Sequence, residues 1–88
     1  MYLHLGNGFL ARDEDVVGIF DLDNTTGSRI TRDFLTRAEK AGNVVNTAED
    51  IPRSFVVCAE KRKKKRTRLY LSQLSPATLL KRSAEDIL

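Results

Sequence analysis

One segment of the sequence concentrates positive charge. Seven of the fifteen Lys and Arg residues of the 88-residue chain fall within residues 61–68, and they are Lys61, Arg62, Lys63, Lys64, Lys65, Arg66 and Arg68. Eight basic and twelve acidic residues remain outside this segment, so the rest of the chain carries a net charge of −4 although the whole chain carries +3. A block of this kind attracts polyanions with an affinity that depends strongly on salt. The segment therefore predicts contacts with nucleic-acid phosphates, and the alternative is a solvated loop tip that only aids solubility.

Two carboxylates, Asp21 and Asp23, follow an apolar strand candidate. Residues 19–25 resemble the first motif of the haloacid-dehalogenase phosphatases, in which paired aspartates hold Mg²⁺ and attack phosphorus. That family needs a doubly wound sheet with a further acidic pair after a later strand, and 88 residues leave no room for the repeated βα units. We expect Asp21, Asp23 and Asn24 to form turn and helix-cap hydrogen bonds. The chain is therefore predicted to be no enzyme and to have no catalytic residues.

The sequence lacks the residues that a metal site or a redox site needs. Cys58 is the single cysteine and lies in a β-rich apolar run, which predicts a small buried hydrophobe, while His4 is the single histidine. No Cys/His set suggests a metal site, and we expect no cofactor and no small-molecule substrate. The absence of a signal-peptide pattern and of a long apolar run predicts a cytoplasmic protein without membrane contact.

The length predicts a single domain over residues 1–88 whose small core favours self-association. Short β-branched and apolar runs predict six strands, at 2–5, 9–11, 16–20, 44–45, 54–59 and 69–72. Ile30, Phe34, Ala38 and Ala41 form one stripe of a helix over 28–41, which Thr25, Thr26 or Ser28 can cap and Gly42 ends. Ser75 and Pro76 begin a second helix, with Leu80, Ala84 and Ile87 on one face and residues 84–88 as a tail ordered only against a neighbouring subunit.

These elements predict an α+β fold with a small, mainly antiparallel sheet, two helices and the order β-β-β-α-β-β-β-α. Residues 61–68 lie between the fifth and sixth strands, so they are expected at the tip of a β-hairpin. Arg53 precedes the fifth strand and is expected near this tip as an eighth phosphate contact. Arg29 and Arg32 on the first helix are weaker candidates, for which surface solvation or an ion pair with Asp33 is favoured.

The whole chain also resembles one family. The similarity runs in order through residues 1–7, 17–21, 31–35, 52–56 and 71–79, and the most distinctive stretches are Met1-Tyr2-Leu3-His4-Leu5-Gly6-Asn7 and Leu71-Ser72-Gln73-Leu74-Ser75-Pro76-Ala77-Thr78-Leu79. These stretches resemble the RemB-like proteins, small bacterial proteins that are grouped with RemA as extracellular-matrix regulators. The resemblance implies a RemA/LytTR-like domain that assembles into ring-like homo-oligomers, binds DNA along the ring and activates matrix and biofilm-type genes.

The match to the RemA type departs at several charged positions. RemA-like proteins carry an arginine before their strongest apolar strand and a basic pair before the strand that begins here at Ser54. The corresponding residues look like Asp15, Asp50 and Ile51, and only Arg53 keeps its charge. Our main hypothesis is a cytoplasmic, DNA-binding transcription regulator that acts as a homo-oligomer through the basic segment 61–68. The alternative is an oligomeric assembly or interaction protein without DNA affinity.

Overall fold

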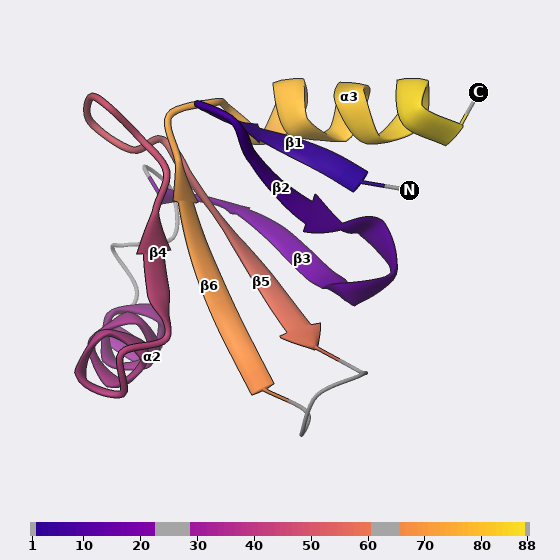
Figure 1. Cartoon of the computed structure of the whole chain (residues 1–88). Helices are drawn as coiled ribbons and strands as arrows, with labels where there is room; N and C mark the ends of the chain where they lie inside the picture. Colours follow the sequence, from indigo (N-terminus) through magenta and orange to yellow (C-terminus); the bar gives the residue numbers. More distant parts are fainter. Residues whose placement is uncertain (1, 23–28, 61–65, 88) are drawn as a thin grey trace.

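A computed structural model of the chain describes residues 2–22, 29–60 and 66–87 (Figure 1). Within these ranges six strands and two α-helices follow one another in the expected order, with a short 3₁₀ helix, η1 (Asp13–Asp15), before the third strand. The strands are β1 (Tyr2–Gly6), β2 (Phe9–Arg12), β3 (Val16–Asp21), β4 (Val44–Asn46), β5 (Ser54–Glu60) and β6 (Arg66–Ser72), and the helices are α2 (Arg29–Lys40) and α3 (Pro76–Ile87). The α+β class is therefore confirmed.

The strands form two sheets, whereas one was expected. Strands β1 and β2 make an antiparallel hairpin of their own, and the other four pair in the order β3-β5-β6-β4. The hairpin lies over a face of the larger sheet because Leu3, Leu5 and Ala11 pack against Val56 and Cys58 of β5. Pairing in the larger sheet is antiparallel except between β4 and β6, which run parallel with Val44 opposite Leu69.

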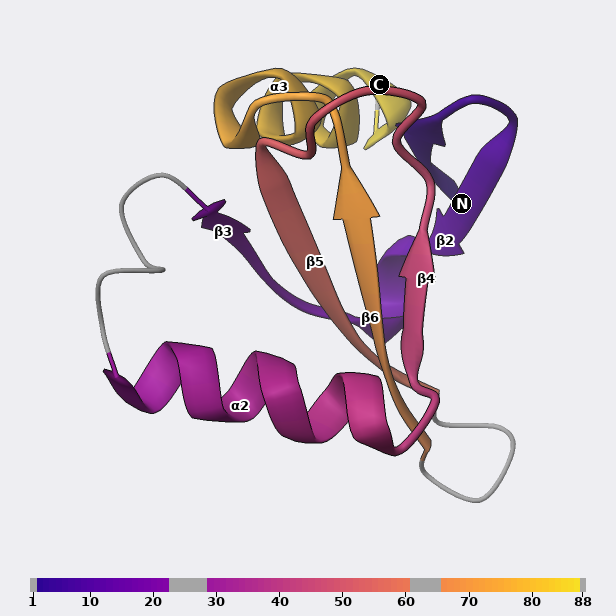
Figure 2. The same cartoon turned by 90° about the vertical axis from the view of Figure 1, so that its left-hand side faces the viewer.

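The larger sheet separates two layers (Figures 1 and 2). Side chains alternate along β5, so Val56 and Cys58 face the hairpin and α3, while Phe55 and Val57 face α2. The main core lies on the hairpin side, where Leu79 of α3 joins the buried residues of β1, β2 and β5. On the opposite side α2 covers the sheet only in part, and none of its residues is buried.

The turn between β1 and β2 forms as predicted. Gly6, Asn7 and Gly8 have φ values of 105°, 54° and 81°, a left-handed region that glycine and asparagine tolerate best. The Asn7 side chain also donates a hydrogen bond to the carbonyl oxygen of Thr47 at 2.6 Å. The hairpin turn is thereby fixed to the chain segment that follows β4.

Buried hydroxyl groups join the layers at one end of the sheet. Ser72 donates to the carbonyl oxygen of Leu5 at 2.7 Å, and Ser54 donates to that of Leu74 at 2.7 Å. Thr47 donates to the carbonyl oxygen of Leu71, also at 2.7 Å. Each of these hydroxyl-bearing residues is buried, and each has a backbone acceptor, as buried polar groups require.

Both helices end or begin at the expected signals. Gly42 follows α2 with φ 73°, and the amides of Gly42 and Asn43 donate to the carbonyl oxygens of Glu39 and Ala38, which is the Schellman arrangement. At the start of α3 the Ser75 hydroxyl accepts a hydrogen bond from the Thr78 amide at 3.2 Å. The candidate caps of α2 between residues 23 and 28 lie outside the described residues.

Helix α3 departs from the prediction in the face that it buries. Among the α3 side chains that the structure describes, Leu79 is the buried one, whereas Leu80, which heads the predicted apolar face, is exposed. The helix continues through Ile87 in the single chain, and the ordering of residues 84–88 against a neighbouring subunit stays a prediction. No helix within the described ranges is long and apolar enough to cross a membrane.

Candidate nucleic-acid interface

The basic segment lies at one end of the β5–β6 ladder. The two strands pair antiparallel from Ser54 opposite Ser72 to Glu60 opposite Arg66, so the chain leaves the sheet at Glu60 and returns at Arg66. The predicted hairpin is thus confirmed, but strand β6 begins three residues earlier than expected. Arg66 and Arg68 are therefore strand residues, because the backbone pairing with β5 continues as far as Glu60. The five basic residues 61–65 lie outside the described residues.

Arg68 forms an ion pair with Glu60. Its Nε lies 3.0 Å from the Glu60 Oε1, and both side chains are partly exposed. Arg68 stands opposite Cys58 in the ladder, so it shares a face with Glu60, which is two residues further along β5. One cation of the basic segment is therefore already paired with a carboxylate of the same chain.

Arg53 does not lie near this end, contrary to expectation. Its amide donates to the carbonyl oxygen of Ser72, which places it at the opposite end of the ladder. The seven residues of β5 separate it from the turn, and at about 3.3 Å per residue they span about 23 Å. Arg53 is exposed, but it lies at the opposite end of the ladder from Arg68.

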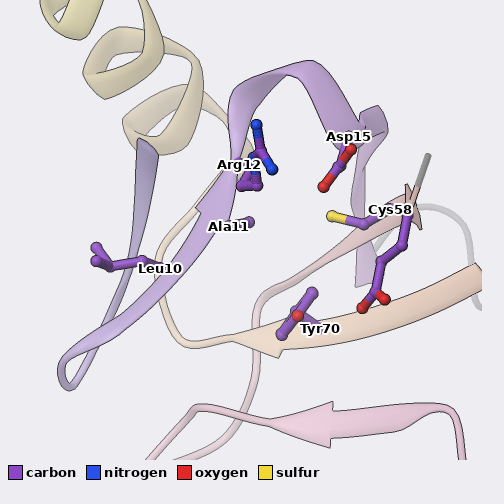
Figure 3. Close-up of a pocket in the computed structure, with 7 residues that line it drawn as sticks. Leu10, Ala11, Arg12, Asp15, Cys58 and Tyr70 are labelled. Carbon is purple, nitrogen blue, oxygen red and sulfur yellow. The ribbon is translucent and has the colours of Figure 1, made fainter. Parts of the chain in front are cut away.

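A recess of about 380 Å³ lies beside the end of the ladder (Figure 3). Its polar lining includes Arg12 and Asp15 from the β2–η1 region and Cys58, Glu60 and Tyr70 from the sheet. The sequence alone did not reveal this recess. The period-two spacing of Cys58 and Glu60 places them on one face, but the approach of Asp15 depends on how the hairpin packs.

Cys58 is inert in this setting. The residue is 2% exposed, and burial, followed by the negative charges of Asp15 and Glu60, raises its thiol pKa from the ordinary value of 9.0 to about 11. The thiol therefore stays protonated at neutral pH, and the prediction of a small buried hydrophobe is confirmed. The same two carboxylates also bring negative charge close to the ladder end from which the basic segment emerges.

The structure describes only one of the two carboxylates, Asp21 and Asp23, that resemble the phosphatase motif. Asp21 is the last residue of β3 and stands opposite Ser54 in the sheet, while Asp23 and Asn24 lie outside the described residues. His4 is an exposed residue of β1 opposite Leu10. Among the residues that the structure describes, no group of three or more His, Cys, Asp or Glu side chains is placed to hold a metal ion.

A comparison with descriptions of known protein families finds no match. Among curated proteins, the chain is 36% identical over 83 residues to the Extracellular matrix regulatory protein B of Bacillus subtilis (strain 168), and the match covers 94% of this chain and 90% of that protein. The chain belongs to the extracellular matrix regulatory protein B family. The resemblance found in the sequence is thereby confirmed, and the name of this RemB-like family records a regulatory role.

Proposed function

We propose that this RemB-like protein is a cytoplasmic regulator that binds DNA without catalysis and controls transcription of matrix or biofilm-type genes. The family name supports regulation. The observation that supports DNA binding is the concentration of charge in the sequence, because seven of the fifteen basic residues fall within residues 61–68, the segment that joins β5 to β6, and the remainder of the chain carries a net charge of −4. Lys61, Arg62, Lys63, Lys64, Lys65 and Arg66 contact phosphates in this proposal, and Arg68 contributes once its ion pair opens.

The mechanism is electrostatic. Phosphate contacts position a protein on DNA but do not read its sequence, so sequence preference would come from the shape or curvature of the duplex. A short basic segment binds weakly by itself. A homo-oligomer, in a ring as the resemblance implies, presents several such segments to one duplex, and the resulting avidity compensates for weak single contacts.

Fluorescence anisotropy with labelled duplex DNA at several salt concentrations tests the proposal. If three to five cations per subunit neutralise phosphates, log K falls against log[salt] with a slope of about −3 to −5 per engaged subunit. Replacing Lys63, Lys64 and Lys65 by glutamine should weaken binding to every duplex and flatten the slope by up to about 3. Folding should survive, since surface substitutions usually cost less than about 0.5 kcal/mol.

A charge-matched control removes three cations from the other end of the sheet. In this control variant glutamine replaces Arg53, which precedes β5, and Lys81 and Arg82 of α3. Residues 61–68 keep their wild-type sequence. This control should bind DNA nearly as tightly as the wild type. If it loses binding and the lysine variant does not, the DNA surface is the one that contains Arg53, and the proposed role of the basic segment is wrong.

A second candidate function is assembly or interaction without DNA affinity. The observation that favours it is the negative charge beside the basic segment, since Glu60 already pairs with Arg68 and Asp15 lines the neighbouring recess. A folded wild type that oligomerises but does not bind duplex DNA even at low salt would select this function over the first.

A further inference from the structure

The recess beside Cys58 has no role in the proposed DNA contact. It opens between the β1–β2 hairpin and the larger sheet, and its lining comes from β2, η1, β5 and β6 (Figure 3). Its volume of about 380 Å³ lies within the range of roughly 300–1,000 Å³ that is usual for small-ligand sites. The recess is therefore large enough for a small molecule or for one side chain of a partner.

Negative charge exceeds positive charge in the lining. The charged side chains there are two carboxylates, Asp15 and Glu60, and one cation, Arg12. Arg12 is already paired with Glu14, which does not line the recess. The Asp15 carboxylate is partly buried, and it forms no ion pair with any residue that the structure describes. The recess therefore holds a carboxylate that no described cation neutralises.

The Cys58 thiol reports on the electrostatic field inside the recess. Asp15 and Glu60 both raise its pKa, after the larger effect of burial, so the two negative charges act on the same point. Figure 3 shows the sulfur pointing towards the side of the recess where Arg12 and Asp15 lie. Cys58 is 2% exposed, and within the described ranges its thiol has no hydrogen-bond partner. This sulfur is therefore a free, weak acceptor for a donor that enters the recess.

The remaining lining supplies apolar and aromatic surface. Ala11 of β2 is buried, and Tyr70 of β6 is partly buried. Tyr70 stands opposite Val56 in the ladder, so its ring lies on the hairpin side of the sheet, as Cys58 does. An aromatic ring attracts a cation over its face, and apolar surface accommodates the alkyl stem of such a group. The lining therefore suits a cation that is carried on an alkyl chain.

A guanidinium matches this lining better than other cations. Its five N–H donors lie in one plane and reach several acceptors at once, whereas an ammonium holds three donors on one atom. The acceptors come from different elements, with Asp15 in η1 and Cys58 and Glu60 in β5. Glu60 keeps acceptor capacity, because its ion pair with Arg68 uses Oε1. A metal ion fits less well, since no three His, Cys, Asp or Glu side chains of the described residues are placed to hold one.

We propose that the recess binds a guanidinium group carried on an alkyl stem. Asp15 and Glu60 accept its hydrogen bonds, and the Tyr70 ring contacts its planar face. Such a group can belong to a free arginine derivative or to an arginine side chain of a partner protein. The inference goes beyond DNA binding, and its tests contain no DNA, so either proposal can fail while the other stands.

Matched small ligands test the charge and the shape of the group. Butylguanidinium is titrated into the isotope-labelled protein at constant ionic strength, and the amide NMR signals of Cys58, Glu60 and Tyr70 should shift to saturation. A ligand of this size should bind with a dissociation constant of about 1 mM. Butylurea has nearly the same shape without the charge and should bind at least about 10-fold more weakly. Butylammonium has the charge without the planar donors and should also bind more weakly.

Substitutions of single carboxylates test which residues hold the group. Asp15→Asn keeps the shape of the side chain and should weaken butylguanidinium binding about 10-fold. Glu60→Gln removes the second carboxylate and should weaken binding as well. Asp33→Asn makes the same change in net charge at an exposed position of α2, on the other side of the sheet, and should leave binding unchanged. Amide signals outside the recess should match those of the wild type, which shows that each variant keeps its fold.

A capped tripeptide with arginine between two glycines separates the two sources. Tighter binding of this peptide than of butylguanidinium assigns the group to a partner protein, and weaker binding assigns it to a small molecule. The proposal is overturned if butylguanidinium gives no saturable shifts at the recess, or if butylurea or butylammonium binds as tightly. It is also overturned if butyrate binds there instead, through Arg12, or if the folded Asp15→Asn variant binds butylguanidinium like the wild type.

Discussion

Glu60 and Arg68 face each other diagonally across the last residues of the β5–β6 ladder, with Nε and Oε1 3.0 Å apart. The ion pair anchors the strand ends from which the basic segment emerges. It also holds one of the seven cations, so the segment presents less free charge to a polyanion than its sequence indicates. Charge at this end of the molecule can therefore be increased by removing an acid as well as decreased by removing lysines.

Replacing Glu60 by glutamine should tighten DNA binding. The substitution removes a negative charge beside the basic segment and releases Arg68 for phosphate contact. Anisotropy titrations should show tighter binding at low salt and a salt slope steeper by up to about 1 per engaged subunit. Glu49→Gln makes the same chemical change at an exposed loop position whose amide binds Gln73, and it should change the slope little. If the two variants change DNA binding equally, the cause is the net charge of the protein and not the release of Arg68.

Ser72→Ala should destabilise the fold by about 2–3 kcal/mol. The Ser72 hydroxyl donates to the carbonyl oxygen of Leu5 and accepts from the Leu74 amide, so alanine leaves two groups without their partner near the core. Urea unfolding of the two proteins measures the difference. Ser83→Ala, at a half-buried position of α3, should stay within about 0.5 kcal/mol of the wild type, and a similar loss there would rule out this explanation.

Cys58 should make stability fall at high pH. Its thiol pKa is about 11 in the folded protein and 9.0 in the unfolded chain, so the folded state holds the proton more tightly. The contribution is complete below pH 9 and is lost as pH rises to 11, by about 2–3 kcal/mol. Cys58→Ala should be less stable at pH 8 but should lack this part of the pH dependence. If the stability curves of the two proteins run parallel between pH 8 and 11, the pKa is not raised.

Gly42→Ala should cost about 1 kcal/mol through the backbone alone. Gly42 has φ 73°, and a β-carbon placed on it would meet no atom within 4 Å, so space does not limit the substitution. Asparagine tolerates the left-handed region better than alanine, and Gly42→Asn should recover part of the loss. Thermal unfolding compares the three proteins. Equal melting temperatures for the alanine and asparagine variants would show that backbone conformation is not the cause.

Local signals predicted the elements well, because each depends on a few neighbouring residues. Gly6-Asn7-Gly8 supply the positive φ values of a tight turn, Ser75-Pro76 start a helix, and Gly42 ends one. The packing of these elements was harder to predict. The spacing of apolar residues shows which of them share a face, but not which neighbour covers it. Leu79, rather than Leu80, is therefore buried, and the β1–β2 hairpin lies over the sheet instead of joining it.

In the candidate site, too, local features could be predicted from the sequence, whereas contacts between elements could not. Strand candidates on either side of residues 61–68 were enough to predict the hairpin, since two β-rich runs flank the charged stretch. The Glu60–Arg68 pair requires the strand register, which the sequence did not define. The distance of Arg53 from the turn was implied by the predicted length of the fifth strand, since a strand of six residues already spans about 20 Å.

The core that joins Leu3 and Leu5 to Leu79 also has a consequence for synthesis. The ribosome releases the β1–β2 hairpin first and α3 last, so the apolar side of the hairpin has no complete partner during translation. The core of the domain is therefore complete only once α3 has been synthesised. A stalled or truncated chain keeps Leu3 and Leu5 exposed, which makes it a substrate for chaperones and proteases.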